Sequence, residues 1–192
     1  MDKKWDGRPD PELLLRQNFP EGESDGKGKL EIFFGYAAGV GKTYAMLDAA
    51  RQEKEAGRDV VAGYIAPHDR PDTMALLDGL EFLPPRTVGY KGIVLREFDL
   101  DAALIRRPDL ILVDELAHTN AAGSRHRKRY QDIEELLRAG ISVYTTVNVQ
   151  HLESLNDVVA SITGIAVAER LPDRIFDRAD QVEVVDIEPA DL

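Results

Sequence analysis

The chain has 192 residues, 43% of them hydrophobic, and its formal net charge is −11 at pH 7. This size and composition are typical of one domain with one substantial core. The acidic charge argues against sequence-independent binding to nucleic acid or to an anionic membrane surface, because both need a positive protein face. The chain has no cysteine, which excludes disulfides and thiolate metal sites and fits a reducing compartment.

Residues 1–29 are rich in Asp, Glu, Lys, Gly and Pro, and we interpret them as a flexible lead-in to a domain over residues 30–192. The N-terminus lacks the apolar core of a signal peptide. No run in the chain approaches the roughly 18 apolar residues of a membrane span. The sequence therefore predicts a soluble, cytoplasmic chain without direct membrane contact.

The stretch 30–43, LEIFFGYAAGVGKT, passes from an apolar run to a glycine-rich segment that ends in Gly41, Lys42 and Thr43. This order is expected of a buried strand, a phosphate-binding loop and a helix. Backbone N–H groups of such a loop surround phosphate oxygens, and the helix directs its positive end at the same place. In this interpretation Lys42 contacts the β- and γ-phosphates of a nucleotide, and Thr43 binds Mg²⁺.

One position departs from the strict pattern G-x-x-x-x-G-K-[ST]. Tyr36 stands where that pattern has glycine, and Gly35 comes one residue early. A Gly-Lys-Thr tripeptide also arises often by chance. The interpretation therefore depends on whether other strand ends supply matching groups.

Apolar runs and helix-forming segments alternate along the rest of the chain. This alternation predicts an α/β fold, a P-loop NTPase-like doubly wound and mostly parallel sheet with helices on both faces. Gly57, Asp99, Gly140 and Gly164 stand at expected helix caps. Strands are predicted at 30–34, 59–66, 110–113, 141–149 and 182–187, with one or two short ones within 86–97, and helices at 42–56, 72–80, 99–106, 125–138 and 152–162.

Two carboxylates, Asp114 and Glu115, follow the apolar strand at 110–113. Ligands of doubly wound sheets bind outside the carboxyl ends of the strands. Asp114 is placed there to orient a Mg²⁺-bound water, and Glu115 is a candidate base that polarises an attacking water or hydroxyl. The alternative is an acidic start to a surface loop, which is the less favoured reading beside a Gly-Lys-Thr loop.

The strand at 141–149 ends in hydrogen-bonding side chains, where a sensor of the γ-phosphate would lie. Asn148 and Gln150 are the first candidates, and Thr145 and Thr146 precede them. Polar residues also simply end strands, so this assignment depends on position. The predicted nucleotide-binding set is Gly39, Val40, Gly41, Lys42, Thr43, Asp114, Asn148 and Gln150, with Thr43 and Asp114 as metal ligands and Lys42 and Glu115 as catalytic residues.

The basic cluster, residues 125–129, lies at a predicted helix start, where positive charge opposes the helix dipole. Three negative partners are open: the acidic surface of this domain, a neighbouring subunit's phosphates through an arginine finger, or a partner segment. The arginine-finger possibility would require a homodimer. A basic cluster that is simply solvated is as well supported as any of the three. The four histidines show no i, i+4 pairing, so no metal site is proposed from them, and His118 has either a loop-orienting or a structural role.

Four sequence blocks resemble the N-terminal cytoplasmic domain of the KdpD family of osmosensitive potassium-channel sensor histidine kinases. The resemblance covers almost the whole chain. The two later blocks are far more specific than a P-loop pattern. The blocks are RPDPELLL, KLEIFFGYAAGVGKTYAML, LILVDELAHTNAAGSRHRKRYQDIEELL, and SVYTTVNVQHLESLNDVV followed by ITGI.

The resemblance implies a cytoplasmic ATP-binding regulatory module with Mg²⁺, in which the Walker A loop contains Gly39, Gly41, Lys42 and Thr43 and Walker B contains Asp114 and Glu115. The family's loop usually has alanine in place of Tyr36 and proline in place of Ala38. Full members continue into a universal-stress-like domain, membrane helices and a histidine-kinase core. The implied partners are these downstream domains, within an inner-membrane protein, and a response regulator.

Three functions remain open from the sequence. The first is a regulatory ATP-binding domain whose occupancy biases a downstream kinase that responds to potassium limitation or osmotic stress. The second is an active ATPase or P-loop kinase in which Glu115 acts on water or on a protein hydroxyl. The third is an interaction module with a vestigial nucleotide site, which would use the basic cluster and the 152–162 helix as contact faces.

Overall fold

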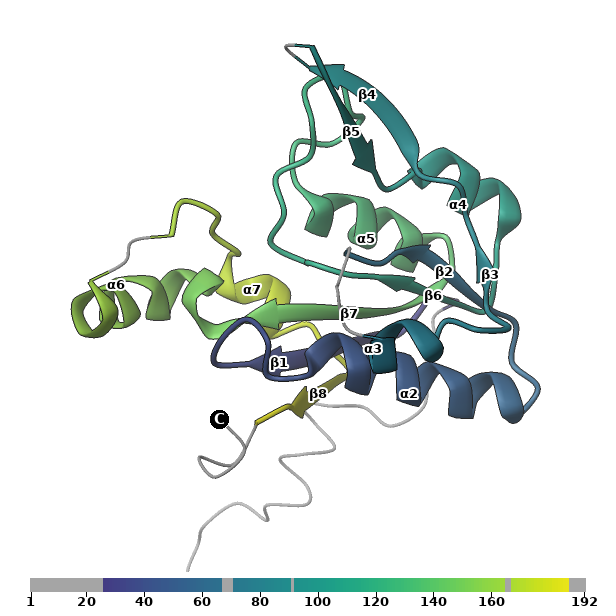
Figure 1. The fold of residues 1–192 in the computed structure, drawn as a ribbon, viewed down its shortest axis with the longest axis horizontal. Helices are drawn as coiled ribbons and strands as arrows, with labels where there is room; N and C mark the ends of the chain where they lie inside the picture. The colour runs from purple at the N-terminus through teal and green to yellow at the C-terminus, as the bar shows by residue number, and fades with distance from the viewer. Residues whose placement is uncertain (1–25, 67–70, 91, 165–166, 187–192) are drawn as a thin grey trace, which may run out of the picture.

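The computed structural model describes residues 26–66, 71–90, 92–164 and 167–186. Its centre is a six-stranded sheet in which every pair of neighbouring strands is parallel, in the order β3-β2-β6-β7-β1-β8 (Figure 1). This confirms the predicted parallel sheet. The strands are β1 (Leu30–Gly35), β2 (Val60–Tyr64), β3 (Glu81–Phe82), β6 (Leu110–Val113), β7 (Ser142–Asn148) and β8 (Gln181–Val184).

Helices cover both faces of the sheet, as predicted. Alternate residues of β6 point to opposite faces: Leu110 and Leu112 pack with the α2 side, whereas Ile111 and Val113 pack with the α5 side. Each face therefore has its own apolar cluster. The helices are α2 (Lys42–Glu55) and α3 (Pro71–Ala75) on one side, α4 (Leu100–Arg106), α5 (Arg129–Arg138) and α7 (Asp173–Phe176) on the other, and α6 (Glu153–Thr163) beyond the end of β7.

The strand order places β7 between β1 and β6. Because these three strands are parallel, their carboxyl ends meet at one edge of the sheet. The loop after β1, the carboxylates after β6 and the polar end of β7 are thereby neighbours. This order is the part of the fold that positions the site.

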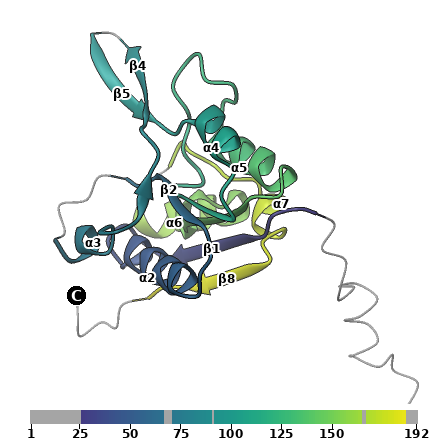
Figure 2. The same ribbon diagram turned by 90° about the vertical axis from the view of Figure 1, so that its right-hand side faces the viewer.

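A second sheet consists only of the antiparallel hairpin β4 (Arg86–Tyr90) and β5 (Ile93–Glu97). It projects from the main sheet in both ribbon views (Figure 2). The prediction of one or two short strands in this region is confirmed. Glu97, the last residue of β5, is 5% exposed and leads back to the domain core.

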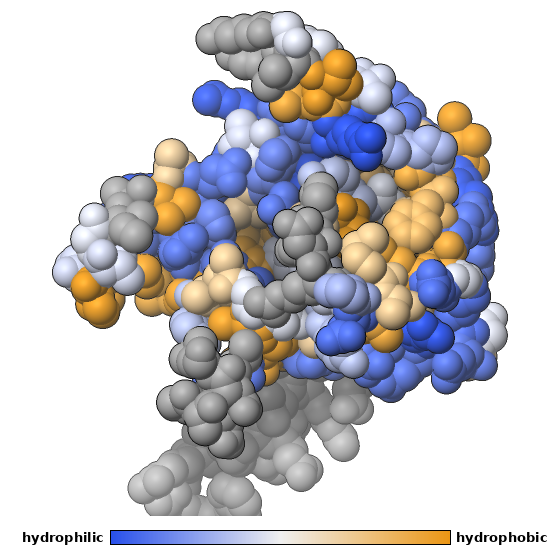
Figure 3. Space-filling model, viewed as in Figure 1, coloured by the Kyte–Doolittle hydropathy of each residue, from blue (hydrophilic) through white to orange (hydrophobic). Residues whose placement is uncertain are grey.

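The predicted helix caps are present. The Asp99 carboxylate accepts a hydrogen bond from the N–H of Ala102 (2.9 Å) at the start of α4. Gly57, Gly140 and Gly164 adopt positive φ after α2, α5 and α6, respectively, where a left-handed residue ends a helix. Helix α6 leaves two large apolar side chains exposed, Val158 and Ile162, and apolar surface is visible at its tip (Figure 3).

Several predicted boundaries are wrong. Helix α5 begins at Arg129 and not at residue 125, because residues 125–127 form bends and Lys128 is extended in an antiparallel bridge with Thr119. Helix α3 ends at Ala75, after which the chain follows tight i→i+3 turns up to Leu80. The predicted strand 141–149 ends at Asn148, and residues 149–151 form a short 3₁₀ helix, η1 (Val149–His151).

The sequence patterns did not predict β3, η1 or α7. Strand β8 spans residues 181–184, and the predicted end of this strand at residue 187 lies outside the described residues, as do residues 1–25 of the lead-in and residues 67–70. The end of the lead-in is attached to the domain, since the N–H of Gly28 donates to the carbonyl of Leu137 (2.8 Å). Within the described ranges, none of the helices has the length and apolar character needed to cross a bilayer.

Candidate functional site

A cavity of about 340 Å³ lies at the carboxyl ends of β1, β6 and β7. The predicted residues that line it are Gly39, Gly41, Lys42, Thr43, Asp114, Glu115 and Asn148. Two members of the predicted set are absent from the lining. The Val40 side chain is buried at 4% exposure, and Gln150 lies in η1 beside the cavity wall.

The loop between β1 and α2 is shaped by its glycines. Gly39 (φ 88°) and Gly41 (φ 96°) occupy the left-handed region that residues with a side chain rarely adopt. Helix α2 starts directly after them at Lys42, whose side chain is buried and whose ammonium donates to the carbonyl of Ala37 (2.7 Å). A positive-φ glycine loop that leads into a helix N-terminus is a backbone arrangement suited to anions.

The environment of Lys42 affects its protonation. Burial lowers the pKa of Lys42 below its ordinary value, and the nearby carboxylate of Asp114 opposes this shift. A buried ammonium that faces the cavity costs less when negative charge is close to it. An anion bound at the glycine loop would therefore stabilise the charged form of Lys42.

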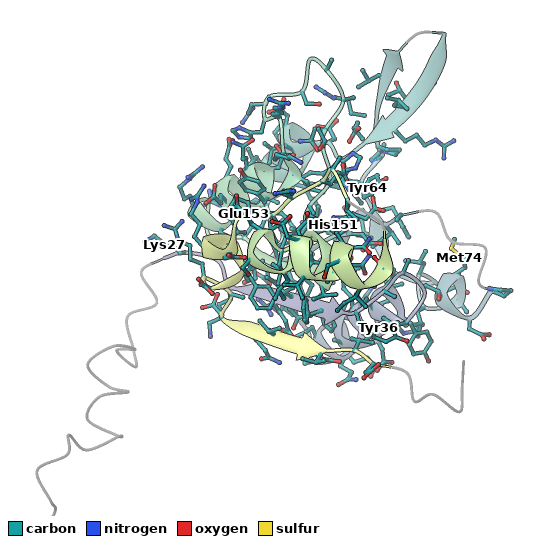
Figure 4. The ribbon with its side chains drawn as sticks, turned by 90° about the vertical axis from the view of Figure 1, so that its left-hand side faces the viewer. Lys27, Tyr36, Tyr64, Met74, His151 and Glu153 are labelled. Carbon is teal, nitrogen blue, oxygen red and sulfur yellow. The ribbon has the colours of Figure 1, made fainter. Side chains whose placement is uncertain are left out.

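The early glycine of the loop has a packing role. A Cβ on Gly35 would lie 2.7 Å from Cγ2 of Val40, too short for a real contact, and 3.0 Å from Cδ of Lys42, which is tighter than most. Gly35 therefore makes room for the stem of the lysine. Tyr36 is 43% exposed and does not line the cavity, and it lies below His151 in Figure 4. Its ring therefore lies outside the cavity.

Asp114 joins three parts of the site through one buried carboxylate, 1% exposed. Oδ2 accepts hydrogen bonds from the Thr43 hydroxyl and from the Ala66 N–H, both at 3.2 Å. Oδ1 accepts from the Glu115 N–H (3.1 Å) and from the Thr146 hydroxyl. The loop after β1, the end of β2 and the middle of β7 are thus held to one side chain.

Glu115 has an uncommon backbone conformation for a residue with a side chain, with φ of 63°. Glu115 lines the cavity with a half-exposed side chain, and its Oε2 lies 3.6 Å from Nη1 of Arg129. Its N–H points to Asp114 Oδ1 and to the Thr146 hydroxyl (3.2 Å). The turn after β6 thus buries one carboxylate and presents the next one to the cavity.

The cavity lining also includes His118, His151 and Glu169, which are outside the set predicted from the sequence. His118 Nε2 lies 3.2 Å from both carboxylate oxygens of Glu97, and His151 Nδ1 lies 2.9 Å from the carbonyl of Glu169. His151 follows the polar end of β7, so its position was a usable signal. Glu169 is brought in by a connection after α6, which no local pattern indicates.

Two residues of β7, Thr145 and Asn148, have a buried side-chain oxygen without a hydrogen-bond partner among the described residues, and only Asn148 lines the cavity. A buried amide oxygen without a donor is costly, which makes it a point where a ligand or water would bond. Thr146 is instead engaged by Asp114, and the fully buried Thr145 does not line the cavity.

The basic cluster finds its negative partners inside the domain. Arg125 pairs with Asp101 and Glu135. Arg129 is fully buried and donates to Glu97 (3.2 Å). The solvated alternative fits Arg127, which is exposed. Of the three partners open from the sequence, the acidic groups of the domain itself are the ones the structure pairs with the cluster.

The oxygen donors of the site suit a hard cation that is shared with a phosphate ligand. No group of three His, Cys, Asp or Glu side chains within the described ranges is placed to hold a metal alone. Thr43 and Asp114 nevertheless offer a hydroxyl and a carboxylate 3.2 Å apart. Mg²⁺ commonly takes one or two such protein oxygens and completes its shell with water and phosphate.

Comparison with known proteins assigns the chain to a family. The family model described as the osmosensitive K⁺ channel His kinase sensor domain, KdpD, matches residues 26–192. Proteins named sensor protein KdpD are 62% identical over 185 residues in Clostridium acetobutylicum and 59% identical over 185 residues in Escherichia coli K12. Each alignment covers 96% of this chain, and the chain spans about a fifth of these relatives, 21% and 20% of their lengths. The chain therefore belongs to the KdpD family of osmosensitive K⁺ channel His kinase sensor domains.

Proposed function

We propose that this domain binds ATP with Mg²⁺ and that occupancy of the site regulates a sensor kinase of which the domain is a part. The observation that carries the proposal is the hydrogen bond between Thr43 and Asp114, beside Lys42 and the positive-φ glycine loop. It joins the loop after β1 to the end of β6, two segments 71 residues apart. We therefore treat the Thr43 hydroxyl and the Asp114 carboxylate as parts of one site.

The loop and Lys42 would bind the phosphates. The Lys42 ammonium donates to a neutral partner, the Ala37 carbonyl, at 2.7 Å. A phosphate oxygen is a stronger acceptor for an ammonium, because charge-assisted hydrogen bonds are roughly twice as strong as neutral ones. We therefore expect the ammonium to turn from Ala37 to a phosphate when nucleotide binds.

Thr43 and Asp114 would hold the metal ion. When bound, Mg²⁺ supplies positive charge that offsets the triphosphate and orients its oxygens. Thr43 lies on the first turn of α2 and Asp114 is fixed by four hydrogen bonds, so neither side chain needs a large movement to serve as ligand. Asn148, with its unmet oxygen, is the group proposed to contact a donor on the ligand or on a bound water.

The regulatory role rests on the family assignment. The relatives are named sensor proteins, and this chain corresponds to about a fifth of their length, 21% in the first of them. We infer that nucleotide occupancy in this cytoplasmic domain biases the downstream domains of the intact, membrane-anchored protein, which pass phosphate to a response regulator. A separate ATP-binding domain suits this task because ligands shift an equilibrium whenever they bind one state better.

A second candidate, hydrolysis or transfer of the γ-phosphoryl group, is favoured by Glu115. Its half-exposed carboxylate faces the cavity beside the buried Asp114. There it could accept a proton from water or from a protein hydroxyl, since a carboxylate within hydrogen-bond reach is a competent base. Loss of turnover in Glu115→Gln with retained ATP binding would support this candidate, and turnover that persists would reject it.

The interaction-module alternative is weakened at the basic cluster. Arg125 and Arg129 are engaged by carboxylates of the domain itself, so they are less available to a partner or to the phosphates of a second subunit. The exposed apolar residues of α6 remain its better support. Unchanged assembly of the intact sensor after Val158→Ser and Ile162→Ser would remove that support.

A nucleotide titration tests the leading proposal. We expect the chain to bind fluorescent ATP more tightly with Mg²⁺ than with EDTA. Lys42→Ala should weaken binding by about 10–100-fold, because it removes a charge-assisted hydrogen bond. The matched control is Lys54→Ala at the exposed end of α2, which removes the same charge and should leave the affinity unchanged. No binding to the wild type, or equal binding to Lys42→Ala, would contradict the proposal.

A further inference from the structure

Arg129 is the largest fully buried side chain in the described part of the chain, with 0% exposure. It is the first residue of α5 and does not line the cavity. Burial of an arginine is costly unless its charge and its donors are matched. Its position directly behind the Asp114 turn therefore calls for a specific role.

Its guanidinium contacts the turn from the interior. Nη1 donates to the carbonyl of Asp114 (3.0 Å) and lies 3.6 Å from Oε2 of Glu115. The guanidinium carbon lies 4.1 Å from the centre of the Tyr64 ring, within the range of a cation–π interaction. One side chain thus supports the backbone of Asp114 and faces the carboxylate of Glu115.

The other side of the guanidinium is anchored at the end of the β4–β5 hairpin. Nη2 donates to Oε2 of the buried Glu97 (3.2 Å). Glu97 also accepts from the N–H of Ala121 (3.0 Å) and lies against Nε2 of His118. Because Glu97 is fixed by several donors, it fixes the arginine in turn.

Glu115 needs such support because its φ of 63° is rarely adopted by residues other than glycine. Strained backbone of this kind persists only when the surrounding structure holds it. The N–H of Glu115 is held by Asp114 and Thr146, and the preceding carbonyl is held by Arg129. The Asp114–Glu115 peptide group is therefore fixed on both sides.

We infer that Arg129 is the positioning residue of the site: it holds the Asp114–Glu115 turn so that Asp114 meets Thr43 and Glu115 faces the cavity. The inference rests on the proposed function where it concerns the metal and the nucleotide. Its structural part, the state of the turn, can be measured without ligand. A failure of the positioning role of Arg129 can therefore be distinguished from a failure of the proposed ATP binding.

The test uses Arg129→Met alone and combined with Glu97→Gln. The single variant leaves Glu97 as a buried charge without its cation and can fail to fold, whereas the double variant removes both charges of the pair. Arg127→Met is the matched control, because Arg127 is exposed in the same cluster. Urea unfolding establishes which variants are folded.

The first measurement is amide hydrogen exchange without nucleotide. In the folded double variant, exchange at Glu115 and Leu116 should be accelerated about tenfold or more by local opening of the turn. Exchange within β6 and throughout Arg127→Met should stay at the wild-type rate. Wild-type exchange at both turn amides in the double variant would overturn the inference, whatever the nucleotide data show.

The second measurement is ATP affinity with Mg²⁺ and with EDTA. A positioning role predicts that the ratio of ATP affinity in Mg²⁺ to ATP affinity in EDTA falls about tenfold or more in the double variant. The reason is that Asp114 no longer keeps its contact with Thr43. Affinity in EDTA, which depends on the glycine loop and Lys42, should be retained. Equal loss in both conditions would contradict positioning through Asp114. Absence of ATP binding in the wild type would overturn the proposed function, while the exchange data still decide the role of Arg129.

Discussion

The two walls of the cavity are built in different ways. The wall after β1 is shaped by backbone: two positive-φ glycines and a third without room for a Cβ set the path to Lys42. The wall after β6 is shaped by side chains: the buried carboxylate of Asp114 accepts four hydrogen bonds, and Arg129 stands behind it. The first wall is local in sequence and the second is assembled from distant segments.

This difference explains what each wall can contribute. A glycine loop presents main-chain groups to any phosphate and is specified by a few consecutive residues. A buried carboxylate must have its partners in place before it can serve a metal ion, because an unsatisfied buried charge is expensive. We therefore expect mutations at the β6 wall to cost stability first, and mutations at the loop to cost affinity first.

The largest expected effect is the loss of stability in Asp114→Ala. Removing the carboxylate leaves the N–H of Ala66 without this acceptor and takes one partner from the Glu115 N–H and from the Thr146 hydroxyl. This loss should lower the free energy of unfolding by about 3–5 kcal/mol in urea denaturation. The control is Asp157→Ala, whose side chain is 86% exposed and should change stability by less than about 0.5 kcal/mol. Equal stability of the two variants would show that the β6 wall does not depend on this carboxylate.

An intermediate effect is expected for Gly35→Ala at the loop wall. The added Cβ would press on Val40 and Lys42 and displace them. We therefore expect the free energy of ATP binding to become about 1–3 kcal/mol less favourable. Gly89→Ala is the matched control, since a Cβ there meets nothing within 4 Å and its φ is not positive. ATP titration of both variants checks this, and unchanged affinity in Gly35→Ala would contradict the packing role of that glycine.

The smallest effect concerns pH and the charges behind the β6 wall. Burial raises the pKa of Asp132 above its ordinary value of 3.8, although a hydrogen bond from Asn120 opposes the shift. The folded state therefore binds the carboxyl proton of Asp132 more tightly than the unfolded state does. As the pH rises above 3.8, the unfolded state loses this proton first, and the free energy of unfolding falls. Asp132→Asn should be more stable than the wild type at neutral pH.

That advantage should shrink as the pH falls and vanish below 3.8, where Asp132 is protonated in both the folded and the unfolded wild type. Urea unfolding of the two proteins between neutral pH and that value provides the measurement. A stability difference that stays constant with pH would assign the effect to packing and not to the charge.

The sequence predicted the parts that are local. The strand at 110–113, the helix after Gly41 and the cap at Asp99 are all present, since each depends on a short pattern of apolar, glycine or capping residues. The two walls could be paired because parallel strands share a carboxyl edge. The confirmed fold class follows from the same alternation of strands and helices.

The partners of the β6 wall could not be predicted in this way. Glu97, Ala66 and Thr146 come from three different elements, and only the folded sheet brings them to the Asp114 turn. The basic cluster shows the same limit. Its sequence gives charge alone, whereas the tertiary structure buries Arg129 and leaves Arg127 at the surface.

A double-mutant cycle on Thr43→Val and Asp114→Asn tests most directly whether the two walls form one Mg²⁺-nucleotide site. ATP affinity in Mg²⁺ would be measured for the wild type, both single variants and the double variant, each first shown to be folded. Residues that share a ligand couple by about 0.5–3 kcal/mol, so we predict that the double variant binds hardly more weakly than the weaker single variant. Losses that simply add would contradict the account, because they would show that Thr43 and Asp114 act independently.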